Sequence, residues 1–343
     1  MPSLCKCSVS VAQVLAALLV FCKNVLEVQS YGEMNKFLIV SSSVTHEVAY
    51  APLPQDKLQP EVQLRQLIGD GLTFPQGLAV DQWRRHLYVA DPTLNRLVYY
   101  VLEPDGDDRL DVSKQYTACE GVEVRWVACD NLGNVYFTAE NTQQVLRLTA
   151  SMIDHGNVKN PEIVYTTSSG VSAPSGVVMD NYYIYWLNKL DPTKTGTVVK
   201  ALHAPNSSYE KMANIDVKGY GLCMTGSNIF FTDETKNMYG LPRLGGVAPT
   251  KVFSNFSEAR GCAFDGMNTV YVADKKKNTI FSFPANVASL LETVQLPLTI
   301  SAYMEGAYGV AVYTVSDSGG AVGLSARLFA VVLSAVAVCM WLP

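Results

Sequence analysis

The stretch "GLAVDQWRRHLYVAD", residues 77–91, consists of two short apolar runs that each end in an aspartate. Its β-branched and aromatic residues and the polar break between the runs are typical of two strands joined by a turn. Asp81 and Asp91 could be a pair of working carboxylates or the ends of two strands. The rest of the chain distinguishes between these interpretations.

The first run of this stretch returns at intervals of about 40 to 50 residues, the period of propeller blades. The series is "GLAVD" (77–81), "WVACD" (126–130), "GVVMD" (176–180), "GLCMT" (221–225), "GCAFD" (261–265) and "GVAVY" (309–313). A second apolar run follows each of the first five members, and further alternating runs precede the next one. Four short strands per repeat predict one blade of a β-propeller.

The sixth member lacks the strands that should follow it. Three matching runs stand at the other end of the repeat region, "FLIVSSS" (37–43), "EVAYAPL" (47–53) and "VQLRQLI" (62–68). The sequence therefore predicts an all-β, six-bladed β-propeller over residues 35–315, built of four-stranded antiparallel blades. Its last blade is closed by the N-terminal strands and the C-terminal strand, which leaves no open sheet edge in the ring.

Both ends of the chain carry targeting patterns. Residues 1–30 contain a short apolar run followed by a polar stretch with small residues, which predicts a cleaved signal peptide; an uncleaved membrane anchor is the alternative. Residues 316–343 have the order of a glycosylphosphatidylinositol (GPI) signal, and a tail-anchored helix is the alternative. We expect attachment at Ser318, with Ser316 and Gly319 as rivals, and removal of about residues 319–343. The protein would then lie on the extracellular face of the plasma membrane.

The charge and the cysteines agree with a secreted protein. The chain carries a formal charge of −5, and both ends are net positive, so the mature part is more acidic still and is a poor candidate for nucleic-acid binding. Four of the eight cysteines lie between the ends and permit two disulfides in an oxidising compartment, without indicating the pairing: Cys119, Cys129, Cys223 and Cys262. Asn206 and Asn255 begin N-glycosylation sequons.

The repeats resemble the NHL and YWTD families of six-bladed propellers, within the TolB-like propeller superfamily. "FPQGLAVD" and "HLYVAD" carry the NHL-like form, whereas "IYWLN" and "IFFTDETKNMYGLPRLGG" carry the YWTD-like form. The resemblance implies the fold and does not choose between the two families. No epidermal-growth-factor-like module flanks the repeats, which departs from receptor-type YWTD proteins.

One residue per blade stands directly before each first run, where loops of a propeller gather around the channel mouth. These residues are Gln76, Arg125, Ser175, Tyr220, Arg260 and Tyr308, and Trp126 replaces the usual glycine of its blade. Arginines and aromatic groups around a concave mouth suit an extracellular protein, peptide or glycan ligand, above all an acidic one. We therefore expect a lipid-anchored binding or adhesion module.

The repeated aspartates favour a structural role. A catalytic group occurs once, whereas Asp81 and Asp91 have counterparts around the ring that can hold turns by accepting backbone hydrogen bonds. The alternative function is a calcium-dependent hydrolase, lactonase or lyase, since gluconolactonase-like and paraoxonase-like propellers hold calcium in the channel. Calcium needs six to eight oxygen ligands, and the sequence assembles neither these nor a metal motif, so we expect no cofactor and no catalytic residue.

Overall fold

A computed structural model describes residues 35–315 except for 55–60, 131, 157–158, 190–195, 206, 216, 235 and 286–297. The predicted signal peptide, the GPI signal with Ser318, and the sequon at Asn206 lie outside the described residues. Asn255 is described and is exposed. The described residues belong to one unit, Asn35–Val315. Among them, no helix is both long enough and apolar enough to cross a membrane.

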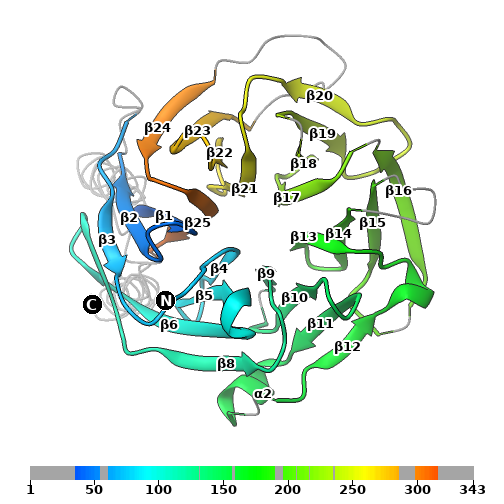
Figure 1. Cartoon of the computed structure of the whole chain (residues 1–343), viewed down its shortest axis with the longest axis horizontal. Coiled ribbons are helices and arrows are strands. Elements are labelled where there is room, and N and C mark those ends of the chain that lie inside the picture. Colours follow the sequence, from blue (N-terminus) through cyan, green and yellow to red (C-terminus); the bar gives the residue numbers. More distant parts are fainter. Residues whose placement is uncertain are drawn as a thin grey trace, which may run out of the picture. The chain divides into compact units, whose positions relative to one another are not determined.

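Six antiparallel sheets stand around a central channel like blades (Figure 1). Blade 1 combines β25 (Ala307–Thr314) with β1 (Lys36–Ser42), β2 (Val48–Leu53) and β3 (Arg65–Ile68). Blade 2 contains β4 (Leu78–Asp81), β5 (His86–Asp91), β6 (Arg96–Asp105), β7 (Arg109–Val112) and β8 (Tyr116–Glu120). Its outer edge is divided, because β7 pairs with the end of β6 and β8 with its beginning.

The remaining four blades follow in chain order, each from its innermost strand outwards. Blade 3 is β9 (Trp126–Cys129), β10 (Val135–Ala139), β11 (Gln144–Leu148) and β12 (Glu162–Tyr165), with α2 (Ala150–Asp154) between its last two strands. Blade 4 is β13 (Pro174–Met179), β14 (Tyr183–Asn188), β15 (Gly196–Leu202) and β16 (Tyr209–Ile215). Blade 5 is β17 (Gly219–Met224), β18 (Asn228–Asp233), β19 (Met238–Pro242) and β20 (Thr250–Phe253). Blade 6 is β21 (Ala259–Phe264), β22 (Thr269–Asp274), β23 (Thr279–Pro284) and β24 (Thr299–Tyr303).

The ring closes as the repeat pattern predicts. β25 pairs antiparallel with β1, so that Leu38 lies opposite Val312 and Ile39 opposite Ala311. In Figure 1 the two ends of the colour scale meet in this blade. Closure joins the first and last strands of the ring in one sheet, with β25 innermost and β3 outermost. The buried faces of neighbouring blades pack into apolar clusters such as the one formed by blades 1 and 2.

The repeated glycine has a steric cause. A Cβ atom on Gly221 would lie 2.0 Å from the carbonyl oxygen of Arg260 in the next blade, and one on Gly309 would lie 2.1 Å from that of Gln76. Gly77, Gly176 and Gly261 face backbone atoms of the next innermost strand in the same way. The innermost strands thus touch backbone to backbone where they begin. We call this end of the ring the mouth face, and the end where innermost strands turn into second strands the hairpin face.

Asp81 holds the hairpin that follows it. Its Oδ1 accepts hydrogen bonds from the backbone N–H groups of Trp83 and Arg84, both at 3.1 Å. The equivalent carboxylates of Asp130, Asp180 and Asp265 accept from the residue two positions on in their own blades. The structural interpretation of this aspartate is therefore right, and its place is the hairpin face.

Asp91 was expected to hold the turn that follows its strand, but its carboxylate binds a segment upstream of it. Its two oxygens accept from the backbone N–H groups of Thr73 and Phe74, 18 and 17 residues upstream, at 2.9 and 3.1 Å. Asp274 holds Ser257 and Glu258 in the same way. These buried carboxylates fix the segments that lead into the innermost strands, so they brace the mouth face and are not free for catalysis.

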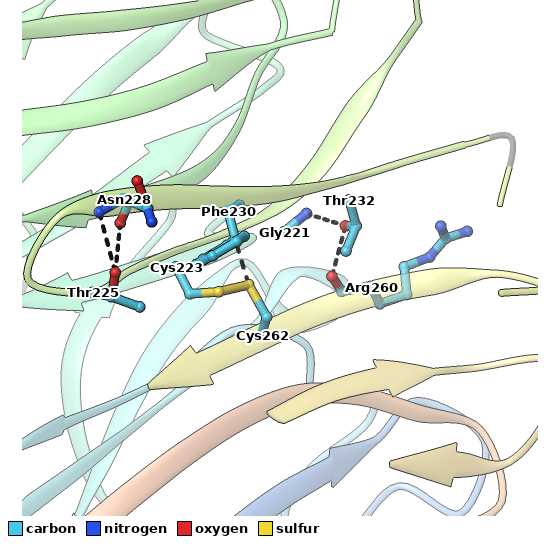
Figure 2. The surroundings of a disulfide bond; sticks show 8 residues. All are labelled: Gly221, Cys223, Thr225, Asn228, Phe230, Thr232, Arg260 and Cys262. Carbon is cyan, nitrogen blue, oxygen red and sulfur yellow. Dashed lines mark hydrogen bonds between the residues drawn. A yellow bond between two sulfur atoms is a disulfide. The ribbon is translucent and has the colours of Figure 1, made fainter. Parts of the chain in front are cut away.

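One of the two permitted disulfides is formed. Cys223 in β17 and Cys262 in β21 are bonded, with Cα atoms 5.5 Å apart, and thereby join neighbouring blades near the channel (Figure 2). Cys119 and Cys129 are free. Burial raises the pKa of the Cys119 thiol to about 11 and that of Cys129 well above its usual value, so both stay protonated at neutral pH.

Replacing Gly221 tests the contact between innermost strands. We expect Gly221→Ala to lower the free energy of unfolding by about 1 to 3 kcal/mol, because the new methyl group would overlap backbone that cannot move aside. Gly226→Ala is the matched control, since a Cβ there meets nothing within 4 Å. Urea unfolding of both variants measures the difference, and equal stabilities would contradict the steric explanation.

Candidate functional site

The sequence-predicted ring residues all lie at the mouth face, some of them inside the first residues of the innermost strands rather than before them. Ser175, Tyr220, Arg260 and Tyr308 belong to β13, β17, β21 and β25. Gln76, Trp126, Ser175 and Tyr308 are buried, whereas Arg125, Tyr220 and Arg260 are partly exposed. The ring therefore divides into a buried group and a group that can reach a ligand.

Hydroxyl groups of the second strands fix the backbone of this ring. The side chains of Ser41, Thr138 and Thr232 donate to the carbonyl oxygens of Gln76, Ser175 and Arg260 at 2.7 to 2.9 Å. Figure 2 shows Thr232 between the strands, where it also accepts from the N–H of Gly221. Each hydroxyl links one blade to the next, so the mouth side chains extend from a rigid frame.

Aromatic side chains fill the mouth end of the channel. Trp126 of blade 3 reaches Tyr308 of blade 1, with ring centroids 5.8 Å apart. The guanidinium carbon of Arg260 lies 4.1 Å from the ring centroid of Tyr220 and 5.8 Å from that of Tyr308. Four of the seven predicted residues thus form one stack, in which cation–π contacts hold the arginine.

Burial controls the ionisation of this stack. It raises the pKa of the Tyr308 hydroxyl to about 12, although the nearby guanidinium groups of Arg260 and Arg125 oppose that shift. Tyr308 is therefore neutral at physiological pH. The stack consequently offers neutral rings and a cation, with no anionic group of its own.

Arg125 belongs to a second group at the mouth, the Arg125 cluster. Its guanidinium pairs with Glu123 and lies 3.2 Å, from Nε to Oε2, from Glu140. Glu140 also pairs with Lys189, whose ammonium lies 5.4 Å from the Tyr220 ring. Burial lowers the pKa of Lys189, and the Glu140 carboxylate limits that shift. The cluster thus adjoins the Arg260 stack through Tyr220.

Sequence reasoning missed the acidic partners and Lys189. Glu123 and Glu258 stand two residues before Arg125 and Arg260, and each pairs with that arginine. Lys275 lies 3.8 Å from Glu258. The repeated Glu-x-Arg spacing was a usable signal. In these two groups four cations meet three carboxylates, so the groups together carry one net positive charge, whereas the chain as a whole is acidic.

Two of the predicted residues are buried within the frame of the ring. Ser175 is fully buried, and its hydroxyl donates to the carbonyl oxygen of Gly219 at 2.8 Å. Gln76 is 2% exposed, and its side-chain oxygen has no hydrogen-bond partner among the described residues. Both residues serve the ring frame, because small or amide side chains fit where the blades converge.

The channel below the mouth does not offer calcium ligands. It encloses about 280 Å³ and is lined by all six innermost strands, mainly by aliphatic and sulfur-containing side chains such as Val80, Val127, Met179 and Met224. Within the described parts of the chain, no group of three or more His, Cys, Asp or Glu residues could hold a metal ion. This donor set does not fit an ion that prefers six to eight oxygens.

No family model and no curated protein matches the sequence. Solved structures do match the fold. A chain in a nidogen/laminin complex superposes with a TM-score of 0.61 at 14% identity, covering 81% of this chain and 98% of the other. A gluconolactonase from Xanthomonas campestris matches with a TM-score of 0.52 at 11% identity, covering 79% and 86%. The chain is a six-bladed β-propeller. At these identities the likeness establishes the fold alone.

Replacing Trp126 tests the aromatic closure of the mouth. We expect Trp126→Ala to lower the free energy of unfolding by about 3 to 5 kcal/mol, because a buried indole leaves a cavity between the innermost strands. Trp83→Ala is the matched control, since that indole is 79% exposed and its loss should change stability by less than about 0.5 kcal/mol. Chemical denaturation followed by circular dichroism measures both.

Proposed function

We propose that this protein is a lipid-anchored, cell-surface binding module whose mouth face contacts an extracellular protein, peptide or glycan. The observation that carries the proposal is the meeting of the Arg260 stack and the Arg125 cluster over Tyr220. Planar aromatic surface beside rigidly held guanidinium groups is the composition found at binding hot spots.

The ligand class follows from charge and exposure. Arg125 and Glu258 each keep 30% of their side chains exposed, and Arg260 and Lys189 keep 12% each. A carboxylate or sulfate group of the ligand would join the existing ion pairs, whereas a cation would compete with four positive charges. Acidic glycans and acidic peptide segments are therefore the ligands we propose.

A calcium-dependent hydrolase or lyase is not proposed. The side chains along the described channel are mainly aliphatic or sulfur-containing. Both oxygens of Asp91 and Oδ1 of Asp81 accept hydrogen bonds from backbone N–H groups.

A double variant tests the mouth. We expect Arg125→Gln with Lys189→Gln to weaken binding to acidic probes on a glycan and peptide array by at least about tenfold, or 1.4 kcal/mol. Arg109→Gln with Lys114→Gln removes the same charge from exposed positions on the outside of blade 2. An equal loss in both variants would mean non-specific charge attraction, and no loss in either would contradict a ligand site at the mouth.

The anchor has its own test. Phosphatidylinositol-specific phospholipase should release the native protein from the cell surface, since the lipid is the only attachment in the proposal. A triple variant, Ser316→Leu with Ser318→Leu and Gly319→Leu, should abolish the release, because it removes the small residues at and around the attachment site. Surface protein that resists the enzyme in its unaltered form would contradict a GPI anchor.

A further inference from the structure

The most exposed apolar side chains gather on the hairpin face. The five large apolar residues with the highest exposure among the described residues are Leu244 (94%), Trp83 (79%), Leu132 (77%), Tyr182 (72%) and Met267 (62%). Each belongs to a loop at the end where the innermost strands finish. On the mouth side the highest values are lower, 56% for Tyr303 and 46% for Val44 and Leu94.

The repeat itself projects four of these side chains. Trp83, Leu132, Tyr182 and Met267 each stand two residues after a strand-ending aspartate, whose Oδ1 accepts their backbone N–H at 2.8 to 3.1 Å. The carboxylate bonds hold the hairpin backbones and leave the side chains pointing outward. Blades 2, 3, 4 and 6 therefore present an apolar tip at the same position.

Blade 5 has Ser227 at this position, and a neighbouring loop supplies the apolar group. The backbone N–H of Arg243 donates to the carbonyl oxygen of Ser227 at 3.0 Å, which places Leu244 beside the blade 5 tip. Val247, 47% exposed, follows in the same loop. Five of the six blades thus carry a large exposed apolar group on the hairpin face.

Blade 1 carries the chain ends at this face instead. The N–H of Val315 donates to the carbonyl oxygen of Asn35 at 2.8 Å, so the chain enters and leaves the propeller at one place. Gln82, next to Trp83, accepts from the N–H of Thr314 at 3.0 Å. Lys36 pairs with Asp265 of the blade 6 hairpin at 3.1 Å. The exit therefore lies between the Trp83 and Met267 tips.

We infer that the hairpin face lies against the lipid bilayer and that its apolar tips enter the headgroup region. The inference rests on the proposed lipid anchor, because Ser318 stands only three positions after Val315. A chain of that length spans at most about 10 Å, so an anchor there keeps this face at the membrane. Trp, Tyr, Leu and Met side chains are those that partition into the interface between lipid and water.

The charges beside the tips have both signs. Arg84 pairs with Asp154 at 2.9 Å, and Asp180 pairs with Arg243, so these groups are already neutralised. Arg85 is exposed beside Trp83, and the nearby β6–β7 hairpin contains Asp105, Asp107 and Asp108. A bilayer of zwitterionic headgroups fits this mixture of exposed charges. The mouth then faces away from the membrane, towards ligands outside the cell.

Trp83 provides the test. The full chain is expressed in cells, extracted with its anchor and reconstituted into phosphatidylcholine vesicles, either plain or brominated on the acyl chains near the headgroup. We expect lower tryptophan emission in brominated vesicles, and no such difference for Trp83→Phe. Trp126 and Trp186 are 7% and 0% exposed and stay out of reach of the bromines.

Matched variants distinguish docking of the whole hairpin face on the bilayer from chance collisions of the Trp83 indole with lipid. Leu132→Ser with Tyr182→Ser should reduce the loss of emission in brominated vesicles, because two neighbouring tips no longer enter the lipid. Val44→Ser with Leu94→Ser removes apolar groups from the mouth side and should leave the loss unchanged.

The outcomes distinguish this inference from the proposed function. Protein that floats with the vesicles but has the same tryptophan emission in plain and brominated vesicles overturns the inference, while the anchor stands. The same holds if Trp83 is shielded by a second copy of the chain or by another protein. Protein that does not float overturns the anchor and the membrane face together. Binding of acidic probes at the mouth is unaffected by either result.

Discussion

The whole arrangement depends on backbone contact between innermost strands at the mouth face. A Cβ on Gly221 or Gly309 would stand about 2 Å from a carbonyl oxygen of the next blade, which is far inside van der Waals contact. Glycine at the start of these strands lets six blades converge on a channel of about 280 Å³. The convergence brings together residues that are far apart in the sequence, and the hydroxyls of Ser41, Thr138 and Thr232 then lock the positions.

The departure from the glycine pattern creates the candidate site. Trp126 stands where five of the six innermost runs have glycine, and its ring meets Tyr308, while Arg260 lies over Tyr220. The repeated carboxylates accept hydrogen bonds from backbone N–H groups and thereby stiffen the ring. A stiff frame with aromatic and cationic groups at its opening is suited to binding, because little conformational entropy is lost when a ligand arrives.

The two faces of the ring differ in chemistry because the chain ends differ from the repeats. Blade 1 uses its hairpin position for the entry and exit of the chain, whereas the other blades use theirs for apolar tips or place Leu244 beside it. The mouth face has the ion pairs and the aromatic stack.

The sequence by itself determined the fold, because glycine, strand-ending aspartate and alternating apolar residues recur often enough to fix six blades and to show where the missing strands of the sixth lie. It also placed five residues at one end of the ring, because residues at the same position of a repeat lie at the same height along the channel. They are Arg125, Trp126, Tyr220, Arg260 and Tyr308. Only the tertiary structure decided that Gln76 and Ser175 are buried, that Glu140 and Lys189 complete the mouth, and that Cys223 pairs with Cys262. It also revealed that Asp91 binds a segment 17 to 18 residues upstream. These facts depend on which side chains from different blades meet, and distances between blades are set by packing that no single repeat encodes.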